Sequence, residues 1–533
     1  MKSTTKKILG ISAAALAVLA AGVFFFGLPQ WEKQRADRVR AVLEKAGLQS
    51  ETVKYSLLRD TITLTGLSGT LNMGAFLDLP NLPPLGDYTF RFKVGSASLP
   101  GFNFSAKQQK GTVPVADSLT VTDFSFEADM PGFDIEQTGS AREILIRKPR
   151  LDVSALLEQI EAKASLTQLF AVLNSFHAER VAYLDYSTKT KTSGPYPLAM
   201  SLSIARLEGK DVGLLRSGPF NMEELKVLTQ DGDTDNYNEV FSLRRCGFAS
   251  FSSPDVYTPI LRQLPASPNE IMEILRQTPL VLKDFAFQGM TVTTPVGAVT
   301  LDSLGVDLVF SPDAFKLAIV LKDLAVPAAL VLSDNGLFPI MPISRDEPFL
   351  FSLNLDGSLD RAEVSANLGT SFSLEEKSLG GITLAGDFTY PLGKAANAME
   401  ALRDATDSDE VLREFKLRSL ALSLKDYGLL DLYFSSFYEM LSSAHLLDRD
   451  STPDVAALRR EVSQEIFRDL SESFPNSPDL PKAAQDLLQR SGSLTITLTA
   501  KPPASFISVL KHPENIPGLP GVSLQVEHTP AAK

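Results

Sequence analysis

The stretch D-T-I-T-L-T-G-L-S-G at residues 60–69 carries the pattern on which the fold prediction depends. Ile62 and Leu64 alternate with threonines, and this period of two is expected of a strand with one buried face. The stretch L-T-I-T-L-T at 494–499 repeats the pattern near the other end of the chain. The two stretches predict that antiparallel sheet runs through most of the protein.

Other segments alternate in the same way. Strands are predicted within 119–126, 181–186, 200–204 and 281–310, and a hairpin is predicted over 349–368 with Asp356-Gly357 as its turn. Helical periodicity predicts helices at 31–47, 154–176, 254–277, 395–415, 430–447, 453–470 and 481–490. Thr452 is the expected cap of the helix at 453–470, with Pro453 in its first turn.

A short sequence recurs at uneven intervals. It reads V-T-D-F-S-F at 121–126, L-K-D-F-A-F at 282–287, L-K-D-L-A-V at 321–326 and L-K-D-Y-G-L at 424–429. The uneven spacing excludes a solenoid of fixed period. A duplicated strand unit and chance recurrence both remain open.

Length and charge limit the classes of protein to consider. A chain of 533 residues is too long for one ordinary core, so two or more domains or one extended sheet are expected. The composition, 44% hydrophobic and 22% charged, excludes a disordered chain. The net charge of −13 argues against a nucleic-acid-binding surface.

The N-terminal region contains an uncharged apolar run from Ile8 to Leu28. As a helix, its 21 residues would span roughly 31 Å, close to the thickness of a bilayer core. We expect a retained anchor, with a cleaved signal peptide as the alternative. Lysines 2, 6 and 7 favour a cytoplasmic N-terminus. The expected anchor residues are Ile8, Leu16, Val23, Phe24, Phe25, Phe26, Leu28 and Trp31. Trp31 is either an interfacial aromatic residue or a surface residue of the next helix.

The predicted fold class is α+β and sheet-dominated. An N-terminal transmembrane helix is followed by a curved, largely antiparallel β-sheet body with helices packed on it. The expected organisation is a cytoplasmic stub and anchor (1–30), a juxtamembrane helix (31–50), a first β-rich periplasmic region (51–280) and a second β-rich region with C-terminal helices (281–533). The helix of 31–50 lies either on the membrane surface or beneath the first sheet.

No motif of a known chemistry is present, so we predict neither an enzyme nor a cofactor. The four histidines are scattered and lack zinc-site spacing. Residues 231–239 resemble the start of a calcium loop, but Asn236 and Ser242 stand where the required Gly and Glu belong, which favours an acidic turn. The single cysteine, Cys246, is either a reactive thiol or, more commonly, a buried inert one. No metal site is predicted.

The start of the chain resembles a known family. The apolar run of 8–28, the short helix after it and V-K-Y-S-L-L-R-D-T-I-T-L-T-G-L-S-G-T-L at 53–71 are similar to the start of AsmA-like proteins of Gram-negative envelopes. The resemblance covers about the first seventy-five residues. It implies a single-pass inner-membrane protein with a β-rich periplasmic body and a hydrophobic groove that carries lipid. It identifies no individual functional residues.

Two functions follow from the one-sided strands. If the apolar face is only partly covered, the protein binds or helps to transfer lipid along a β-sheet groove. If the face is sealed as an ordinary core, the protein is a non-enzymatic envelope scaffold. The expected location is the inner membrane, with the bulk of the chain in the periplasm. The expected partners are the inner membrane, phospholipid and envelope proteins, and not nucleic acid.

Overall fold

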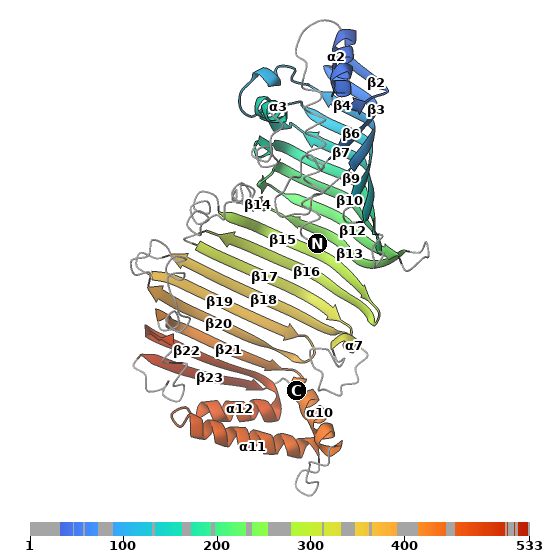
Figure 1. Ribbon diagram of the computed structural model, residues 1–533. Coiled ribbons are helices and arrows are strands. Elements are labelled where there is room, and N and C mark those ends of the chain that lie inside the picture. Colours follow the sequence, from blue (N-terminus) through green and yellow to red (C-terminus); the bar gives the residue numbers. More distant parts are fainter. Residues whose placement is uncertain are drawn as a thin grey trace. The chain divides into compact units, whose positions relative to one another are not determined.

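The computed structural model is shown in Figure 1. It describes residues 32–45, 47–56, 59–72, 89–130, 134–161, 172–192, 198–230, 237–253, 279–311, 314–331, 347–361, 365–391, 414–443, 454–506, 509, 516 and 521–530. The chain divides into two compact units, Met1–Thr278 (unit 1) and Pro279–Lys533 (unit 2). Each unit is described by itself.

Unit 1 is an antiparallel sheet whose long strands pair in the order β3–β4–β6–β7–β9–β10–β12–β13. Short strands β1 and β2 both pair with β3, and the pairs β5–β8 and β11–β14 lie between longer strands in sequence. The strands are β1 (Leu48–Gln49), β2 (Thr52–Ser56), β3 (Thr61–Asn72), β4 (Thr89–Pro100), β5 (Val113–Pro114), β6 (Ser118–Met130), β7 (Ile135–Arg147), β8 (Arg150–Leu151), β9 (His177–Thr192), β10 (Leu198–Gly213), β11 (Arg216–Ser217), β12 (Phe220–Gln230), β13 (Tyr237–Phe248) and β14 (Ser250–Ser252).

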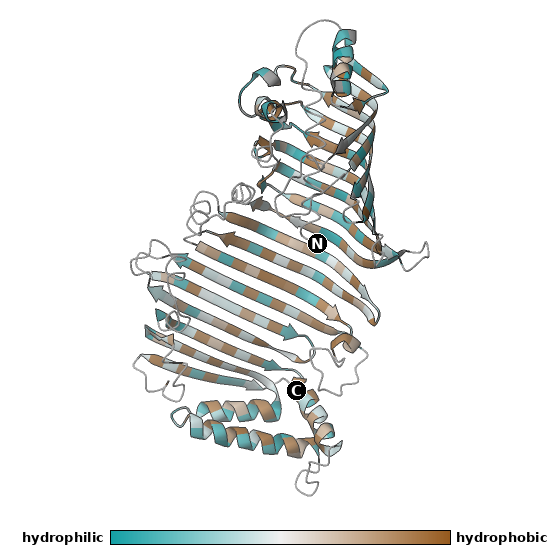
Figure 2. Ribbon diagram, viewed as in Figure 1, coloured by the Kyte–Doolittle hydropathy of each residue, from teal (hydrophilic) through white to brown (hydrophobic). Residues whose placement is uncertain are grey.

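The described strands of unit 2 form a simpler meander of nine, each antiparallel to the next along the chain. Its strands are β15 (Leu280–Thr294), β16 (Gly297–Phe310), β17 (Ala314–Val326), β18 (Phe349–Arg361), β19 (Ser365–Glu376), β20 (Gly380–Pro391), β21 (Lys416–Asp426), β22 (Gly492–Ser505) and β23 (Val522–Pro530). Hydrophobic and hydrophilic residues alternate along these strands in Figure 2, so each sheet has one apolar face.

The described part of the chain contains few helices. Unit 1 has α2 (Glu32–Lys45), the 3-10 turn η2 (Ala106–Gln108) and α3 (Val153–Glu161), and unit 2 has α7 (Ala328–Val331), α10 (Leu429–Ser443), α11 (Val455–Ser473) and α12 (Asp479–Arg490).

Helix α2 packs on the sheet of unit 1. Val39 and Leu43 on one helix face are 1% and 0% exposed and belong to the same core as the first strands. Arg35 donates a hydrogen bond of 2.6 Å to the Tyr55 hydroxyl, which donates in turn to Asp60 at 2.7 Å. Of the two alternatives for this helix, packing beneath the first sheet is confirmed.

The strict period of two breaks along one line that crosses the sheet of unit 1. Leu64 and Leu67 in β3 are both buried although they are three positions apart, and so are Val121 and Phe124 in β6. The register aligns the interrupting residues of eight strands into a seam. The seam residues are Gly66, Gly95, Asp123, Arg142, Asp185, Ala205, Glu224 and Arg244.

Every second strand has a left-handed residue at the seam. Gly66, Asp123, Asp185 and Glu224 have φ between 49° and 59°. Gly and Asp adopt this conformation more readily than most residues. The strand segments on both sides of such a residue can therefore turn their apolar side chains to the same face of the sheet. The seam lets a long strand keep one apolar face through a change of pleat.

The predicted fold class is wrong. Strands hold 64% of the described residues, and none of the six described α-helices is long and apolar enough to cross a membrane. An α+β fold places helices as a layer on the sheet, whereas the described helices lie against the first strands of unit 1 and against the ends of strands in unit 2. The expected anchor residues, Ile8, Leu16, Val23, Phe24, Phe25, Phe26, Leu28 and Trp31, lie outside the described residues.

The predicted strands are confirmed as elements, but one predicted turn and one predicted helix cap are wrong. Strands occupy all the segments that alternate in the sequence, but Asp356 and Gly357 lie inside β18 rather than in a turn. The cap of α11 is Asp454, whose carboxylate accepts the Ala457 N–H at 2.7 Å, rather than Thr452. The predicted helix at 254–277 lies outside the described residues, and so do residues 395–413 of the helix predicted at 395–415.

Candidate functional site

The apolar face of the unit 2 sheet is the candidate site among the described residues. Cross-strand partners line up on it in rows that run perpendicular to the strands. One row is apolar in all nine strands, and we call it the central row. Its members are Phe285, Val306, Ile319, Leu355, Phe372, Leu384, Leu422, Ile496 and Val526.

A second row beside the central row is apolar in eight strands and ends at His528 in β23. Its members are Phe287, Leu304, Leu321, Leu353, Leu374, Ile382, Leu424, Leu494 and His528. Neighbouring strands are about 4.8 Å apart, so a row of nine strands extends for roughly 38 Å. Apart from His528 at the end of the second row, both rows consist of apolar side chains.

The opposite face of the same sheet has the reverse chemistry. Serine and threonine hydroxyls pair with one another across neighbouring strands, as in Ser373–Thr383 at 3.1 Å and Thr499–Ser523 at 2.6 Å. These pairs satisfy polar groups on a solvated face and need no burial. The difference between the faces shows that the apolar rows belong to one side of the sheet only.

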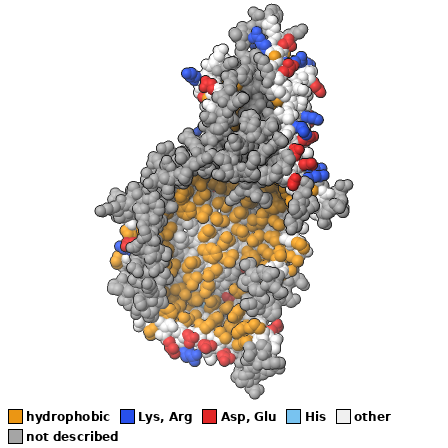
Figure 3. All heavy atoms as spheres, viewed as in Figure 1, with side chains coloured by type: hydrophobic (Ala, Val, Ile, Leu, Met, Phe, Trp, Pro, Cys, Tyr) orange, Lys and Arg blue, Asp and Glu red, His pale blue; other side chains and the backbone are white. Residues whose placement is uncertain are grey.

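The apolar face is most exposed in the middle of the sheet. Leu374 and Ile382 are each 37% exposed and Leu384 is 43% exposed, and they lie in β19 and β20, the fifth and sixth of nine strands. In an ordinary core the central strands are the most deeply covered. Figure 3 shows hydrophobic side chains gathered over this sheet on the side toward the viewer. Neighbouring exposed apolar side chains in the middle of a sheet are typical of an interaction surface.

One end of the strands is closed by α7 and by a buried carboxylate. Ala328 and Val331 of α7 pack against Phe349 at the start of β18. Glu376 ends β19 and accepts backbone N–H groups from Leu350 at 3.1 Å and Leu379 at 2.7 Å. The charge at this end is therefore used by the backbone and does not face the apolar rows as a free group.

The other end of the strands is closed by aromatic rings. The Phe388 ring lies 5.1 Å from that of Phe506 and 6.3 Å from that of Phe415, both edge to face. Leu417, nearby in β21, is 0% exposed and packs with Val509 and Ile516. The two ends of the strands are thus packed, while the middle rows between them stay accessible.

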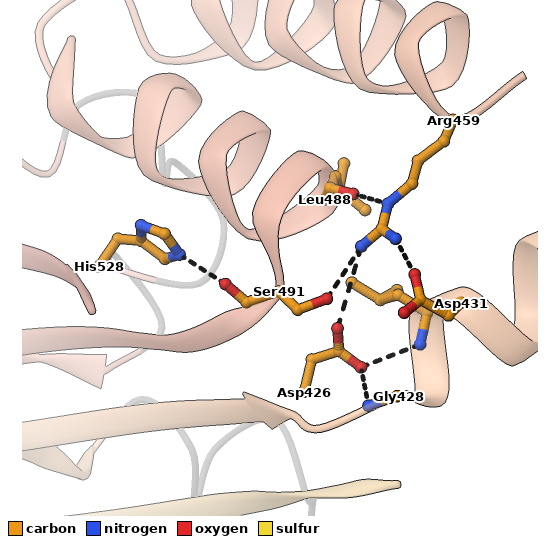
Figure 4. Close-up of polar contacts among 8 residues, drawn as sticks. Asp426, Gly428, Asp431, Arg459, Leu488, Ser491 and His528 are labelled. Atoms are coloured by element: carbon orange, nitrogen blue, oxygen red, sulfur yellow. Dashed lines mark hydrogen bonds and ion pairs between the residues drawn. The ribbon is translucent and has the colours of Figure 1, made fainter. Parts of the chain in front are cut away.

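Helices α10, α11 and α12 are joined to the last strands through Arg459 (Figure 4). The Arg459 guanidinium donates to Asp431, to the Leu488 carbonyl and to the Ser491 hydroxyl, the last at 3.1 Å. It also lies 4.0 Å from the carboxylate of Asp426, a residue that is 4% exposed at the end of β21.

Asp426 also fixes the start of α10. Its other carboxylate oxygen accepts the N–H groups of Gly428 at 3.2 Å and Leu430 at 2.9 Å. In addition, Ala483 and Leu487 of α12 pack against Leu494 of β22. This cluster is structural: it fastens the helices at the last strands of the sheet, where β23 would otherwise leave an open edge.

The apolar face of unit 1 is covered where it can be followed in the first strands. Phe92, Val94 and Ile144 are 2%, 2% and 3% exposed, and side chains of α2 and α3 complete one core. Burial raises the pKa of Tyr186, and its buried hydroxyl has no hydrogen-bond partner among the described residues. Covered strands of this kind leave no accessible apolar field.

The sequence-predicted candidates are not brought together. Cys246 is buried, and burial raises the pKa of its thiol to about 11, which confirms the inert alternative. His177 begins β9, and His528 lies 3.3 Å from the Ser491 carbonyl. Residues 231–236 of the acidic stretch lie outside the described residues, and no group of His, Cys, Asp and Glu within the described ranges could hold a metal ion.

The recurring Asp sequence has a structural explanation that its letters alone did not give. Asp123, Asp284 and Asp323 are all left-handed, with φ between 51° and 53°. At Asp284 and Asp323 the register shifts, so these two are bulges. The carboxylate of Asp307 on the neighbouring strand accepts the Asp284 N–H at 2.6 Å. The fourth member, Asp426, caps α10 instead.

Comparison with protein-family models finds no match, and comparison with curated proteins finds none either. The similarity of residues 53–71 to AsmA-like proteins therefore stays a prediction. Any function must be inferred from the apolar face itself.

Proposed function

We propose that the protein binds lipid on the apolar face of unit 2 and helps to transfer it along the rows of that face. The observation that carries the proposal is the exposure of Leu374, Ile382 and Leu384 in the middle of the sheet. An apolar ligand that removes these side chains from water lowers the free energy of the complex.

The chemistry of the face restricts the ligand. The central row has no charge and no hydrogen-bonding side chain over nine strands. A charged or polar ligand would lose its water there without compensation. A fatty acyl chain has no polar group to desolvate, and each CH₂ that it buries contributes about 0.8 kcal/mol to binding. Acyl lipid is therefore the ligand class that fits.

A photocrosslinking amino acid placed in the full-length protein tests the proposal in cells. At position 384, on the apolar face, irradiation should give adducts whose added mass is that of a lipid. Position 383 is the matched control, because Thr383 lies one residue away on the opposite face and hydrogen-bonds to Ser373. Equal lipid labelling at both positions would contradict the proposal. Protein adducts alone at 384 would support the envelope scaffold instead.

The location is a separate prediction. We expect the inner membrane, with the bulk of the chain in the periplasm. Protease added to spheroplasts should degrade both units if the prediction is correct, whereas protection of both units in intact spheroplasts would contradict it.

A further inference from the structure

One hydroxyl interrupts the middle rows of the apolar face, and it belongs to Thr370 of β19. Thr370 lies in the row next to the central row, on the side away from Leu374. That row consists of Leu282, Leu308, Leu317, Gly357, Thr370, Gly386, Leu420, Leu498 and Leu524. The row beyond it is apolar again, from Leu280 through Phe388 to Leu417. Thr370 is therefore the one hydrogen-bonding side chain in three adjoining rows.

The partners of Thr370 across the strands cannot bind its hydroxyl. On the opposite face of the sheet, hydroxyl groups meet hydroxyl groups, as in Ser423–Thr495 at 3.3 Å. Thr370 instead faces Gly357 on one side and Gly386 on the other. Within the part of the chain that the structure describes, no group hydrogen-bonds to the Thr370 hydroxyl. The backbone of this interior strand is already committed to the ladders on both sides.

Thr370 is also accessible. Its side chain is exposed, in the middle of the sheet where the apolar face is most open, and Leu384, 43% exposed, is in the adjoining row. A ligand that covers Leu384 also covers the hydroxyl and takes it out of water. The hydroxyl then needs a partner on the ligand, because a buried unpaired polar group is costly.

We infer that Thr370 is a specificity-determining residue, whose hydroxyl donates a hydrogen bond to the carboxylic ester carbonyl of a bound acyl lipid. This inference rests on the proposed lipid binding. Binding sites of this kind combine an apolar lining with a few polar groups that fix the orientation of the ligand. An ester carbonyl is an uncharged acceptor directly attached to an acyl chain, so it suits one donor in an apolar field. An alkyl ether at the same position lacks the carbonyl oxygen.

A competition between two lipids tests the inference on the full chain. The protein is incubated with vesicles that contain equal amounts of a diacyl phospholipid and its dialkyl ether analogue, and native mass spectrometry reads the ratio of bound lipids. We expect the wild-type protein to favour the ester lipid by about fivefold, the ratio that one neutral hydrogen bond gives. Thr370→Val keeps the shape of the side chain and should bring the ratio to about one, whereas Thr370→Ser should preserve it.

The outcomes separate the inference from the function on which it rests. If the wild-type protein binds neither lipid, the proposed function fails. If it binds both lipids and Thr370→Val leaves their ratio unchanged, lipid binding stands and the role of Thr370 is overturned. Leu384→Asp serves as the second variant, because it should reduce binding of both lipids equally by placing a charge on the face.

Discussion

The two units share the same alternating strand pattern but differ in how far their apolar faces are covered. In the first strands of unit 1, the apolar side chains meet those of α2 and α3 and lie almost wholly out of water. In unit 2, the apolar rows are packed only at the ends of the strands and are most exposed at β19 and β20. Whether an apolar sheet face is a closed core or an accessible surface therefore depends on what covers it, and not on its own sequence.

The difference also separates stability from function. A side chain in the covered part of unit 1 contributes to folding, because its removal leaves a cavity that the surroundings cannot fill. A side chain in the open rows of unit 2 already touches water, so its removal should affect ligand binding more than folding. This division of roles can be tested by matched substitutions.

The largest expected effect is on unfolding. Leu64→Ala removes a side chain that is 1% exposed in β3, and we expect it to destabilise unit 1 by about 4 kcal/mol. The matched change Leu384→Ala, at 43% exposure in β20, should destabilise unit 2 by less than about 1 kcal/mol. Hydrogen exchange of peptides from each unit measures both free energies separately. Equal losses would show that the face of unit 2 is packed like a core.

The next effect concerns α10, α11 and α12, the helices that are joined to the last strands of unit 2. Arg459→Met leaves the buried Asp426 carboxylate without its cation, and we expect a loss of about 3 kcal/mol. Faster hydrogen exchange in α11, α12 and β22, with unit 1 unchanged, is the expected readout. Arg468→Met is the control, because Arg468 lies on the same helix with its side chain 65% exposed, and it should change stability by less than about 0.5 kcal/mol. Equal effects of the two changes would remove the structural role of the cluster.

Much of the strand content could be predicted from the sequence, because a period of two is a local property. Ile62, Leu64, Leu494 and Ile496 show it plainly, and all lie in strands. The same local signals were misleading where pairing overrides them. Asp356-Gly357 is a strong turn signal, yet Gly357 pairs with Leu317 on one side and with Thr370 on the other. Two neighbouring ladders outweigh the preference of two residues for a turn.

Local sequence patterns could not predict the seam of unit 1 or the exposure of the apolar face of unit 2, for different reasons. The three-residue step from Leu64 to Leu67 is visible in the sequence, but only the alignment of eight strands shows that it is a change of pleat. Exposure depends on what lies over a face, which no local pattern contains. The candidate site was therefore predictable as an apolar face, whereas its most exposed point at Leu384 and the Thr370 hydroxyl in its middle rows were not.

The smallest expected effect appears only at alkaline pH and belongs to unit 1. Burial raises the pKa of the Cys246 thiol from 9.0 to about 11, because the thiolate would lose its water. The folded state therefore keeps the thiol protonated more strongly than the unfolded state does. The stability that this difference provides is fully present below pH 9 and is lost as the pH rises through about 11.

That loss is measured by urea unfolding of the full chain at pH 8 and pH 11, with hydrogen exchange of unit 1 peptides as the readout. The wild-type protein should lose roughly 2 kcal/mol more than Cys246→Ala over this range, because only the wild type has a thiol to titrate. All other titratable groups are the same in both proteins and cancel in the comparison. Unit 2 contains no cysteine, so its stability should fall equally in both proteins. If the free energies of unfolding of wild type and variant differ by the same amount at both pH values, water reaches Cys246. Unit 1 would then be as open at this position as the apolar face of unit 2.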